Sequence, residues 1–108
     1  MKITKTSKYK KTYKKYLFNK HKEDEIKRLE DIEKLIISSD NLHKLLISVY
    51  KNVYHIEKKR VNLKEIYTAR LNSKLRLYMR PVGEYPYNEI EIDEIVFEEI
   101  DDKHYKEG

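Results

Sequence analysis

Residues 63–82 read LKEIYTARLNSKLRLYMRPV, in which two alternating stretches are separated by a short polar segment. Successive side chains of an extended chain point to opposite faces, so each stretch has one apolar face. These faces comprise Tyr67, Ala69 and Leu71 before the turn and Leu75, Leu77 and Met79 after it. The opposite faces comprise Ile66, Thr68 and Arg70, and then Arg76, Tyr78 and Arg80. Because residues 72–74 are suited to a turn, the pattern predicts a β-hairpin.

Two further strands are expected at the ends of the chain. Residues 1–6, MKITKT, alternate as a short edge strand would. Residues 89–100, EIEIDEIVFEEI, follow the turn-forming segment GEYPYN and predict a last strand. Its alternation slips between Ile92 and Ile95, which indicates either a bulge near Asp93 or a central strand buried on both faces.

A Lys-rich helix is predicted over residues 8–18, KYKKTYKKYLF, with Thr6 or Ser7 as its N-cap. Its tyrosines at positions 9, 13 and 16 fall on one helical face. Such a stripe is more typical of a core-facing side than of a surface that stacks on nucleobases.

A second helix is predicted over residues 23–39, where acids crowd the first turn and apolar residues recur at three- and four-residue steps. The recurring residues are Ile26, Leu29, Ile32, Leu35 and Ile36. Asp40 or Asn41 is then expected to cap a shorter helix through residues 42–53. Its buried side would comprise Leu42, Leu45, Leu46 and Val49.

The expected order is a strand, one helix, one or two more helices, and three strands. This order predicts a single α+β domain over residues 1–108, a small β-α-α-β-β-β unit whose helices pack on one face of a mainly antiparallel sheet. A length of 108 residues with 39% apolar and 40% charged residues fits one small domain with a heavily solvated surface.

Composition excludes several classes of site. The chain has no Cys, which removes disulfides and thiol chemistry, and it has only two isolated Gly, so no phosphate-binding Gly-rich loop is present. Its four His lack the short spacings of metal sites. The apolar runs are too short to span a membrane, and a cytoplasmic protein without a metal or organic cofactor is expected.

Charge is distributed unevenly along the chain. Residues 1–22 hold nine Lys and no acid, whereas residues 84–102 hold nine Asp or Glu and no base. If a sheet brings these segments together, the Lys-rich end is partly neutralised and the middle of the chain supplies the basic surface for a polyanion. The alternative is that residues 8–22 form no more than a solvated Lys-rich helix.

Basic side chains on the predicted hairpin, together with a terminal His-Tyr pair, carry the chemistry that the residues suggest. Arg70, Arg76 and Arg80 are suited to phosphate because a guanidinium donates two parallel hydrogen bonds. If the last strand pairs beside the hairpin, His104 and Tyr105 reach the same rim. Metal-free RNA cleavage needs such a set, since the 2′-hydroxyl is the nucleophile and the protein moves protons and stabilises charge. The alternatives are structural arginines that pair with the acidic last strand, and an exposed terminal His.

Three stretches of the chain resemble the RelE/ParE superfamily of type II toxin–antitoxin toxins. They are ITKTSKYKKTYKK at residues 3–15, YTARLNSKLRLYMRP at 67–81 and IVFEEIDDKHY at 95–105. The resemblance implies a RelE/YoeB-like domain that cleaves mRNA on the ribosome and is blocked by a cognate antitoxin. The segment 40–64 is longer than in compact members of that family.

The resemblance also implies roles for individual residues. Arg76 matches the phosphate-stabilising arginine, and His104 and Tyr105 match the closing His-Tyr, as proton donor or acceptor and as orienting or stacking group. Arg70 matches a basic residue ahead of the turn that contacts RNA or a buried acid. The residues placed where RelE-like toxins have activating lysines are Lys58, Lys59 and Arg60, and Glu57 is an alternative carboxylate base.

We therefore expect an RNA-cleaving toxin, with the arginines and lysines at positions 58–60, 70 and 80 contacting RNA. Its expected partners are the ribosome, mRNA and an antitoxin that covers the basic face. Two other interpretations stay open: a ParE-like inhibitor of DNA gyrase that cuts no RNA, and a catalytically inactive binding module of the same fold.

Overall fold

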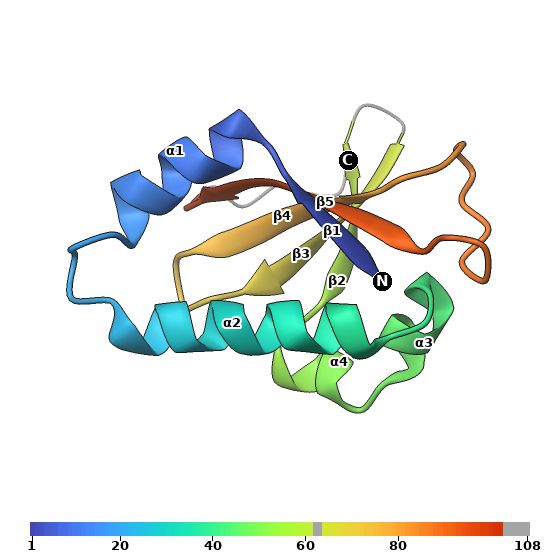
Figure 1. The fold of residues 1–108 in the computed structure, drawn as a ribbon, viewed down its shortest axis with the longest axis horizontal. Helices are drawn as coiled ribbons and strands as arrows, with labels where there is room; N and C mark the ends of the chain where they lie inside the picture. Colours follow the sequence, from blue (N-terminus) through green and yellow to red (C-terminus); the bar gives the residue numbers. More distant parts are fainter. Residues whose placement is uncertain (62–63, 103–108) are drawn as a thin grey trace.

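The computed structural model describes residues 1–61 and 64–102, with side chains described for 1–60 and 65–102. The elements, in chain order, are β1 (Lys2–Lys5), α1 (Ser7–Tyr16), α2 (Glu23–Ser38), α3 (Leu42–Ile47), α4 (Tyr50–Val53), β2 (Glu57–Val61), β3 (Lys64–Arg70), β4 (Arg76–Pro81) and β5 (Glu94–Asp101). The sheet has the order β1-β5-β4-β3-β2, and all neighbours are antiparallel except β1 and β5. The predicted α+β class with a mainly antiparallel sheet is confirmed (Figure 1).

The predicted hairpin is present as β3 and β4. The strands pair in the register Tyr67 with Met79, Ala69 with Leu77 and Arg70 with Arg76. Ala69, Leu77 and Met79 are almost fully buried. The apolar face of the hairpin therefore lies against the core, and the arginines lie on the opposite face.

Strand β5 is central, between β1 and β4. Residues 95–97 are all buried, so the slip in alternation reflects a strand covered on both faces, the second of the two interpretations. A bulge is present as well, but its extra residue is Glu98 and not one near Asp93. The hydroxyl of Thr6 donates to the carbonyl of Glu98 at 2.7 Å and so fixes the bulge beside the start of α1.

The expected order of elements places Lys58, Lys59 and Arg60 outside any strand, in a loop or helix end before the hairpin, and this prediction is wrong. They form β2, an edge strand that pairs with β3, so the sheet has five strands instead of the four expected. The sequence EKKRV has one apolar residue, and backbone pairing with β3 holds it in the sheet. Lysines are common on edge strands because they oppose pairing with another chain.

Helix α1 begins at the predicted cap, because the Thr6 hydroxyl accepts from the amide of Tyr9 at 2.9 Å. Tyr9 is buried with its ring 5.5 Å from that of Phe97, while Tyr13 and Tyr16 are partly buried against the core. The tyrosine stripe therefore faces the core, as predicted.

Helix α2 confirms the second predicted helix, with Leu29, Ile32 and Ile36 buried. Figure 1 shows α2 along the sheet, α1 beside β5, and α3 and α4 near the C-terminal half of α2. No helix within the described ranges is long and apolar enough to cross a membrane.

The single helix expected over residues 42–53 is divided into α3 and α4. Asn41 is the N-cap of α3, and its side chain accepts from the amide of Lys44 at 2.9 Å. Ser48 ends α3, and its hydroxyl accepts from the amide of Tyr50 at 3.2 Å, which offers the backbone an alternative to a continued helix. Val49, expected in the core, is consequently 75% exposed.

Candidate functional site

Arg70 and Arg76 lie directly opposite each other at the ends of β3 and β4. Arg76 alternates with the buried residues Leu75 and Leu77, so both arginines lie on the face of the sheet turned away from the helical core. This face is called the outer face below. Asp101, the last residue of β5, is the register partner of Arg76 on the other side.

The next row across the outer face is polar and buried. It consists of Thr68, Tyr78 and Glu99, which are register partners in that order and are 3%, 3% and 9% exposed. The Glu99 carboxylate lies 3.0 Å from the ammonium of Lys8, on α1. The most buried carboxylate of this face is thus neutralised by α1 and not by the arginines.

The Arg76 guanidinium is held from one side by the β3–β4 turn. Its Nη1 donates to the carbonyls of Asn72 at 2.8 Å and Leu75 at 3.2 Å. Burial, and secondarily the positive charge of Arg70, lowers the pKa of Arg76 from its ordinary value. An arginine stays charged in a protein even so, and an anionic ligand would relieve both costs.

Arg70 is fixed through its backbone. Its amide donates to the Tyr54 carbonyl at 2.9 Å, and its carbonyl accepts from Nε of Arg28 at 2.5 Å. Arg28, on α2, also donates to the Val53 carbonyl at 2.7 Å and lies 5.0 Å from the Tyr54 ring. Arg28 therefore ties the end of β3 to α4 and positions Arg70.

Neither Arg70 nor Arg76 forms an ion pair with a carboxylate of the described residues. In addition, Nε of Arg70 is buried and lacks a hydrogen-bond partner. A buried donor without an acceptor is costly, and a guanidinium matches the oxygens of a phosphate. Among the described residues, this pair therefore has the chemistry best suited to an anion.

Asn72 and Arg28 are positioning residues that the sequence reasoning missed. The sequence pattern places Asn72 only in a turn, yet its Nδ2 donates to the carboxylate of Glu25 on α2 at 2.9 Å. This hydrogen bond is the main reason that the pKa of Glu25 is lowered. The position of Asn72, a polar residue in the short turn before the second strand of the hairpin, is a sequence signal for its role. Nothing in the helical pattern around Arg28 indicates that this side chain holds Arg70.

Glu57 and Lys59 lie on the outer face at the edge strand, because Glu57 pairs in register with Thr68 and Lys59 with Ile66. Their side chains form an ion pair at 3.0 Å. This hydrogen bond from Lys59, to which the charge of Arg70 adds, lowers the pKa of Glu57. The carboxylate is therefore ionised at neutral pH, but it is a weaker base than an ordinary glutamate.

The other predicted contacts are divided between the two faces. Lys58 and Arg60 alternate with Lys59, so they lie on the opposite face of β2, where Lys58 pairs with Glu65 at 2.9 Å. Arg80 lies on the outer face, but its Nε is 2.6 Å from the carboxylate of Glu98. The structure thus places Arg70, Arg76, Lys59 and Arg80 on the outer face and does not place Lys58 or Arg60 there. Lys59 is opposite Ile66, four residues before Arg70 on β3, so its backbone does not lie at the end of the face that carries the arginine pair.

His104 and Tyr105 lie outside the described residues. The prediction that they reach the rim of the hairpin requires the last strand to pair beside it, and β5 does pair with β4. Among the described residues, no group of three or more His, Asp or Glu side chains is arranged to hold a metal ion.

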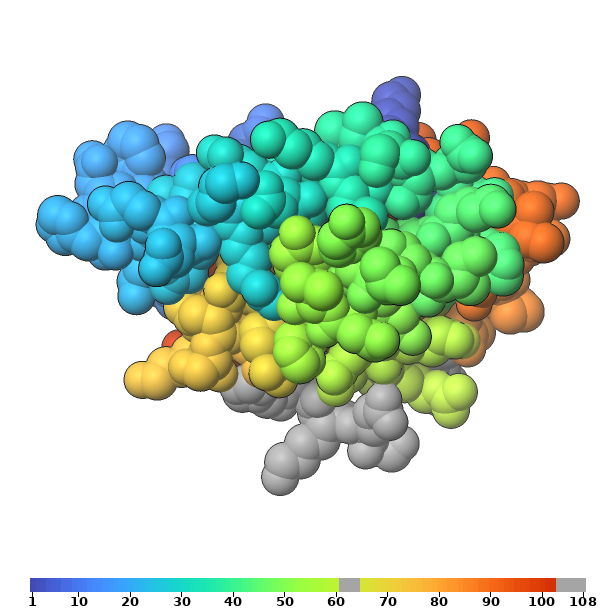
Figure 2. Space-filling view, turned by 90° about the horizontal axis from the view of Figure 1, so that it is seen from below, coloured from blue at the N-terminus to red at the C-terminus, as the bar shows by residue number. Residues whose placement is uncertain are grey.

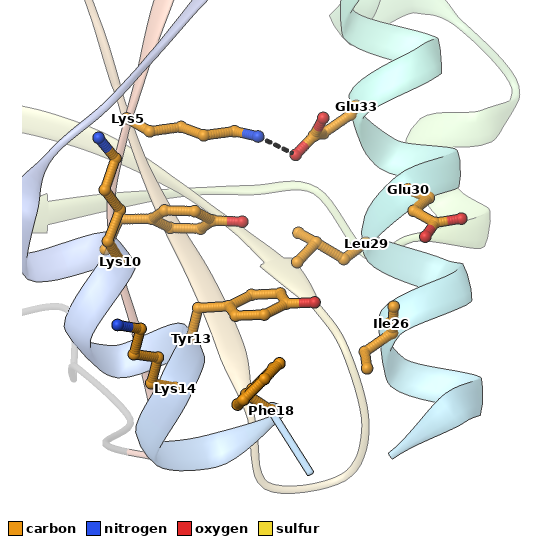
Figure 3. Close-up of a pocket in the computed structure, with 10 residues that line it drawn as sticks. Lys5, Lys10, Tyr13, Lys14, Phe18, Ile26, Leu29, Glu30 and Glu33 are labelled. Atoms are coloured by element: carbon orange, nitrogen blue, oxygen red, sulfur yellow. Dashed lines mark ion pairs between the residues drawn. The ribbon is translucent and has the colours of Figure 1, made fainter. Parts of the chain in front are cut away.

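A groove lies between α1 and α2, apart from the arginine pair (Figure 3). This groove of about 550 Å³ has an apolar floor that includes Tyr13, Phe18 and Leu29. Lysines of β1 and α1 line one wall and Glu30 and Glu33 of α2 the other. Phe18 is 54% exposed although it lines the groove, so the floor is not fully covered by the chain's own side chains.

Comparisons with protein-family models, with curated proteins and with solved structures gave no match for this chain.

Proposed function

We propose that the protein is the toxin of a type II toxin–antitoxin system and acts as a ribosome-dependent endoribonuclease on mRNA. The observation that carries the proposal is the Arg70–Arg76 pair, two register partners on the outer face that form no ion pair with a carboxylate of the described residues. The RelE/ParE-like stretches around this pair and at the end of the chain support the same function.

The reaction needs no protein nucleophile. The 2′-hydroxyl loses its proton and its oxygen attacks the adjacent phosphorus, and the bond to the 5′-oxygen then breaks as that oxygen gains a proton. The products are a 2′,3′-cyclic phosphate and a 5′-hydroxyl end. Arg76 stabilises the negative charge that develops on the phosphorane, with Arg70 beside it. His104 is proposed for a proton step and Tyr105 for orienting the reacting groups or stacking on a base.

Glu57 is the weaker candidate for the base. A general base is most effective when its pKa lies near the working pH, and the pKa of Glu57 is shifted away from that range by Lys59. We therefore propose that Glu57 keeps Lys59 in place on the outer face and that the proton steps use other groups.

The proposed protein partner is an antitoxin with an acidic segment that covers the arginines. The α1–α2 groove supports such a partner because its apolar floor lies between a basic and an acidic wall. An amphipathic helix with acids along one side of its apolar stripe and bases along the other would match both walls. The helix of such an antitoxin would bind the groove on the helical side of the sheet, and its acidic segment would cover Arg70 and Arg76 on the outer face and so block RNA cleavage.

Induced expression in a bacterial host tests the function, with primer extension on an abundant transcript in the presence and absence of translation. We expect in-frame cuts that vanish when translation is blocked. Arg76→Ala should lower cleavage about 10²- to 10³-fold, as removal of a transition-state donor does. Arg80→Ala is the comparison on the same strand face. The sequence predicts an RNA contact for Arg80, but its ion pair with Glu98 should make the loss of cleavage much smaller than for Arg76→Ala.

Growth arrest with intact mRNA would contradict this proposal and favour a protein target such as gyrase. Neither arrest nor cleavage from a folded protein would favour the inactive binding module. If both arginine variants lost activity equally, Arg76 would have no special role.

A further inference from the structure

His55 adopts a backbone conformation that usually belongs to glycine. Its φ is 49°, in the left-handed region, and it follows the C-cap residue of α4. The His55 amide donates to the Asn52 carbonyl at 3.3 Å, and the Ile56 amide donates to the Lys51 carbonyl at 2.9 Å. This is the Schellman arrangement, in which glycine is the common residue at the position of His55. An outlier of this kind is a reason to ask what the side chain does.

The His55 side chain lines a cleft of about 630 Å³ between α4 and β2. The cleft is lined by Lys51, Asn52, His55, Ile56, Glu57, Lys58 and Lys59. Two of its lysines are engaged in the pairs Lys58–Glu65 and Lys59–Glu57. Lys51 and His55 form no ion pair with any described side chain. An ammonium and an imidazole therefore remain available to an anion in the cleft.

The cleft adjoins the arginine pair. The amide of Arg70 donates to the carbonyl of Tyr54, the residue immediately before His55, at 2.9 Å. Glu57, which lines the cleft, is opposite Thr68, two residues before Arg70 on β3. Figure 2 looks onto this side of the molecule, where the yellow-green residues of α4 lie beside the yellow residues of the β3–β4 turn. A polyanion that leaves Arg70 toward the sheet edge thus meets the cleft next.

We propose that this cleft is a second phosphate-binding site, in which Lys51 and His55 hold a backbone phosphate that flanks the one at Arg70 and Arg76. The inference rests on the proposed function in that it takes the ligand to be single-stranded RNA. Contacts to backbone phosphates carry no base information, so the cleft sets affinity and register and leaves the choice of sequence to other contacts.

His55→Gly separates a binding role from a structural one. Glycine suits the left-handed backbone, so we expect the melting temperature to stay the same or rise. Affinity for a single-stranded RNA oligonucleotide of about ten nucleotides, followed by fluorescence anisotropy at about 50 mM salt, should fall about three- to tenfold. Lys51→Gln should weaken binding too and reduce the slope of log K against log[salt] by about 0.7, the value for one phosphate contact on a single strand.

His21→Gly is the matched control. His21 is also exposed and also has a positive φ, of 55°, but it lies in the loop between α1 and α2. The same substitution there relieves the same backbone conformation away from the cleft, so RNA affinity should not change.

The outcomes distinguish this inference from the proposed function. If His55→Gly and Lys51→Gln bind RNA like the unmodified protein while Arg76→Ala binds weakly, the cleft is not a phosphate site and the arginine site stands. If the unmodified protein does not bind the oligonucleotide, this inference fails, whereas the proposed function, in which the ribosome presents the mRNA, is decided by the primer-extension experiment. If Arg76→Ala binds RNA as tightly as the unmodified protein, the arginine pair is not a phosphate site and the proposed function loses the observation that carries it. Equal losses in His55→Gly and His21→Gly would also overturn the cleft, since the effect would then be nonspecific.

Discussion

At the scale of single residues, Asn72 shapes the end of the hairpin that carries Arg76. Its Oδ1 accepts from the amides of Lys74 at 2.8 Å and Leu75 at 2.7 Å, which closes the turn. Its Nδ2 binds Glu25 on α2, and its carbonyl accepts from Nη1 of Arg76. One residue therefore fixes the turn, joins it to a helix and orients the guanidinium that the proposed chemistry depends on.

Asn72→Ala should lower the free energy of unfolding by about 1–3 kcal/mol at pH 7, because two backbone amides and a carboxylate lose their partner. The loss should depend on pH. The Asn72 hydrogen bond lowers the folded-state pKa of Glu25, so its contribution is present above the unfolded pKa of about 4.3 and is lost as the pH falls through the folded value. Urea unfolding of the unmodified protein and Asn72→Ala should therefore show a difference in the free energy of unfolding that becomes smaller below about pH 4.

Glu25→Gln provides the control for this dependence, since it removes the titrating carboxylate and leaves Asn72 in place. The gap between Glu25→Gln and the double variant Glu25→Gln/Asn72→Ala should be smaller than the gap in the unmodified protein, and independent of pH over that range. A gap between the unmodified protein and Asn72→Ala that stays constant from pH 7 to pH 3 would contradict the assignment.

At the scale of elements, the sequence predicts those whose own side chains alternate or repeat. The hairpin and α2 each have a continuous apolar face, so the spacing of their apolar residues predicts them, and Thr6 and Asn41 are predictable as helix N-caps. Strand β2 could not be predicted in this way, because its residues join the sheet through backbone hydrogen bonds to β3 and not through an apolar face. The break after α3 depends on one hydroxyl, that of Ser48, which the leucine pattern conceals. The same limit applies to the site: Arg70 and Arg76 were found from the strand pattern, whereas the cleft at α4 requires the unpredicted β2.

The Arg28 side chain joins α2, α4 and β3, so its removal should destabilise the contacts among all three elements. Arg28→Ala leaves the carbonyls of Val53 and Arg70 without these donors, so we expect a loss of about 2–3 kcal/mol in the free energy of unfolding. Lys34→Ala on the same helix, at an exposed position, should change stability by less than about 0.5 kcal/mol. Urea denaturation measures both.

Arg28→Ala should also weaken RNA binding although Arg28 lies on the core side, because Arg70 loses its anchor. A variant with normal RNA affinity and reduced stability would show that Arg28 supports the fold without positioning Arg70.

At the scale of the whole molecule, the two oppositely charged ends of the chain meet. β1 runs parallel to β5, the Thr4 hydroxyl donates to Glu94 at 2.9 Å, and Lys8 pairs with Glu99. The predicted neutralisation of the Lys-rich end is thus partial, since Lys11 on the same helix is exposed and forms no ion pair within the described part of the chain. Lysines of α1 therefore divide into those that hold the fold and those that face solvent.

Charge reversal at two positions one turn apart on α1 should separate these roles. Lys8→Glu places a second negative charge beside the nearly buried Glu99, and we expect a loss of about 1–2 kcal/mol in stability. Lys11→Glu should leave the melting temperature nearly unchanged, because exposed charges contribute little to folding, yet it should weaken co-sedimentation with ribosomes and reduce its salt dependence. If Lys11→Glu lowered stability as much as Lys8→Glu, the charge of α1 would serve mainly to hold the acidic strand. If it changed neither property, α1 would play no part in binding RNA, and the outer face with the α4 cleft would supply that interaction alone.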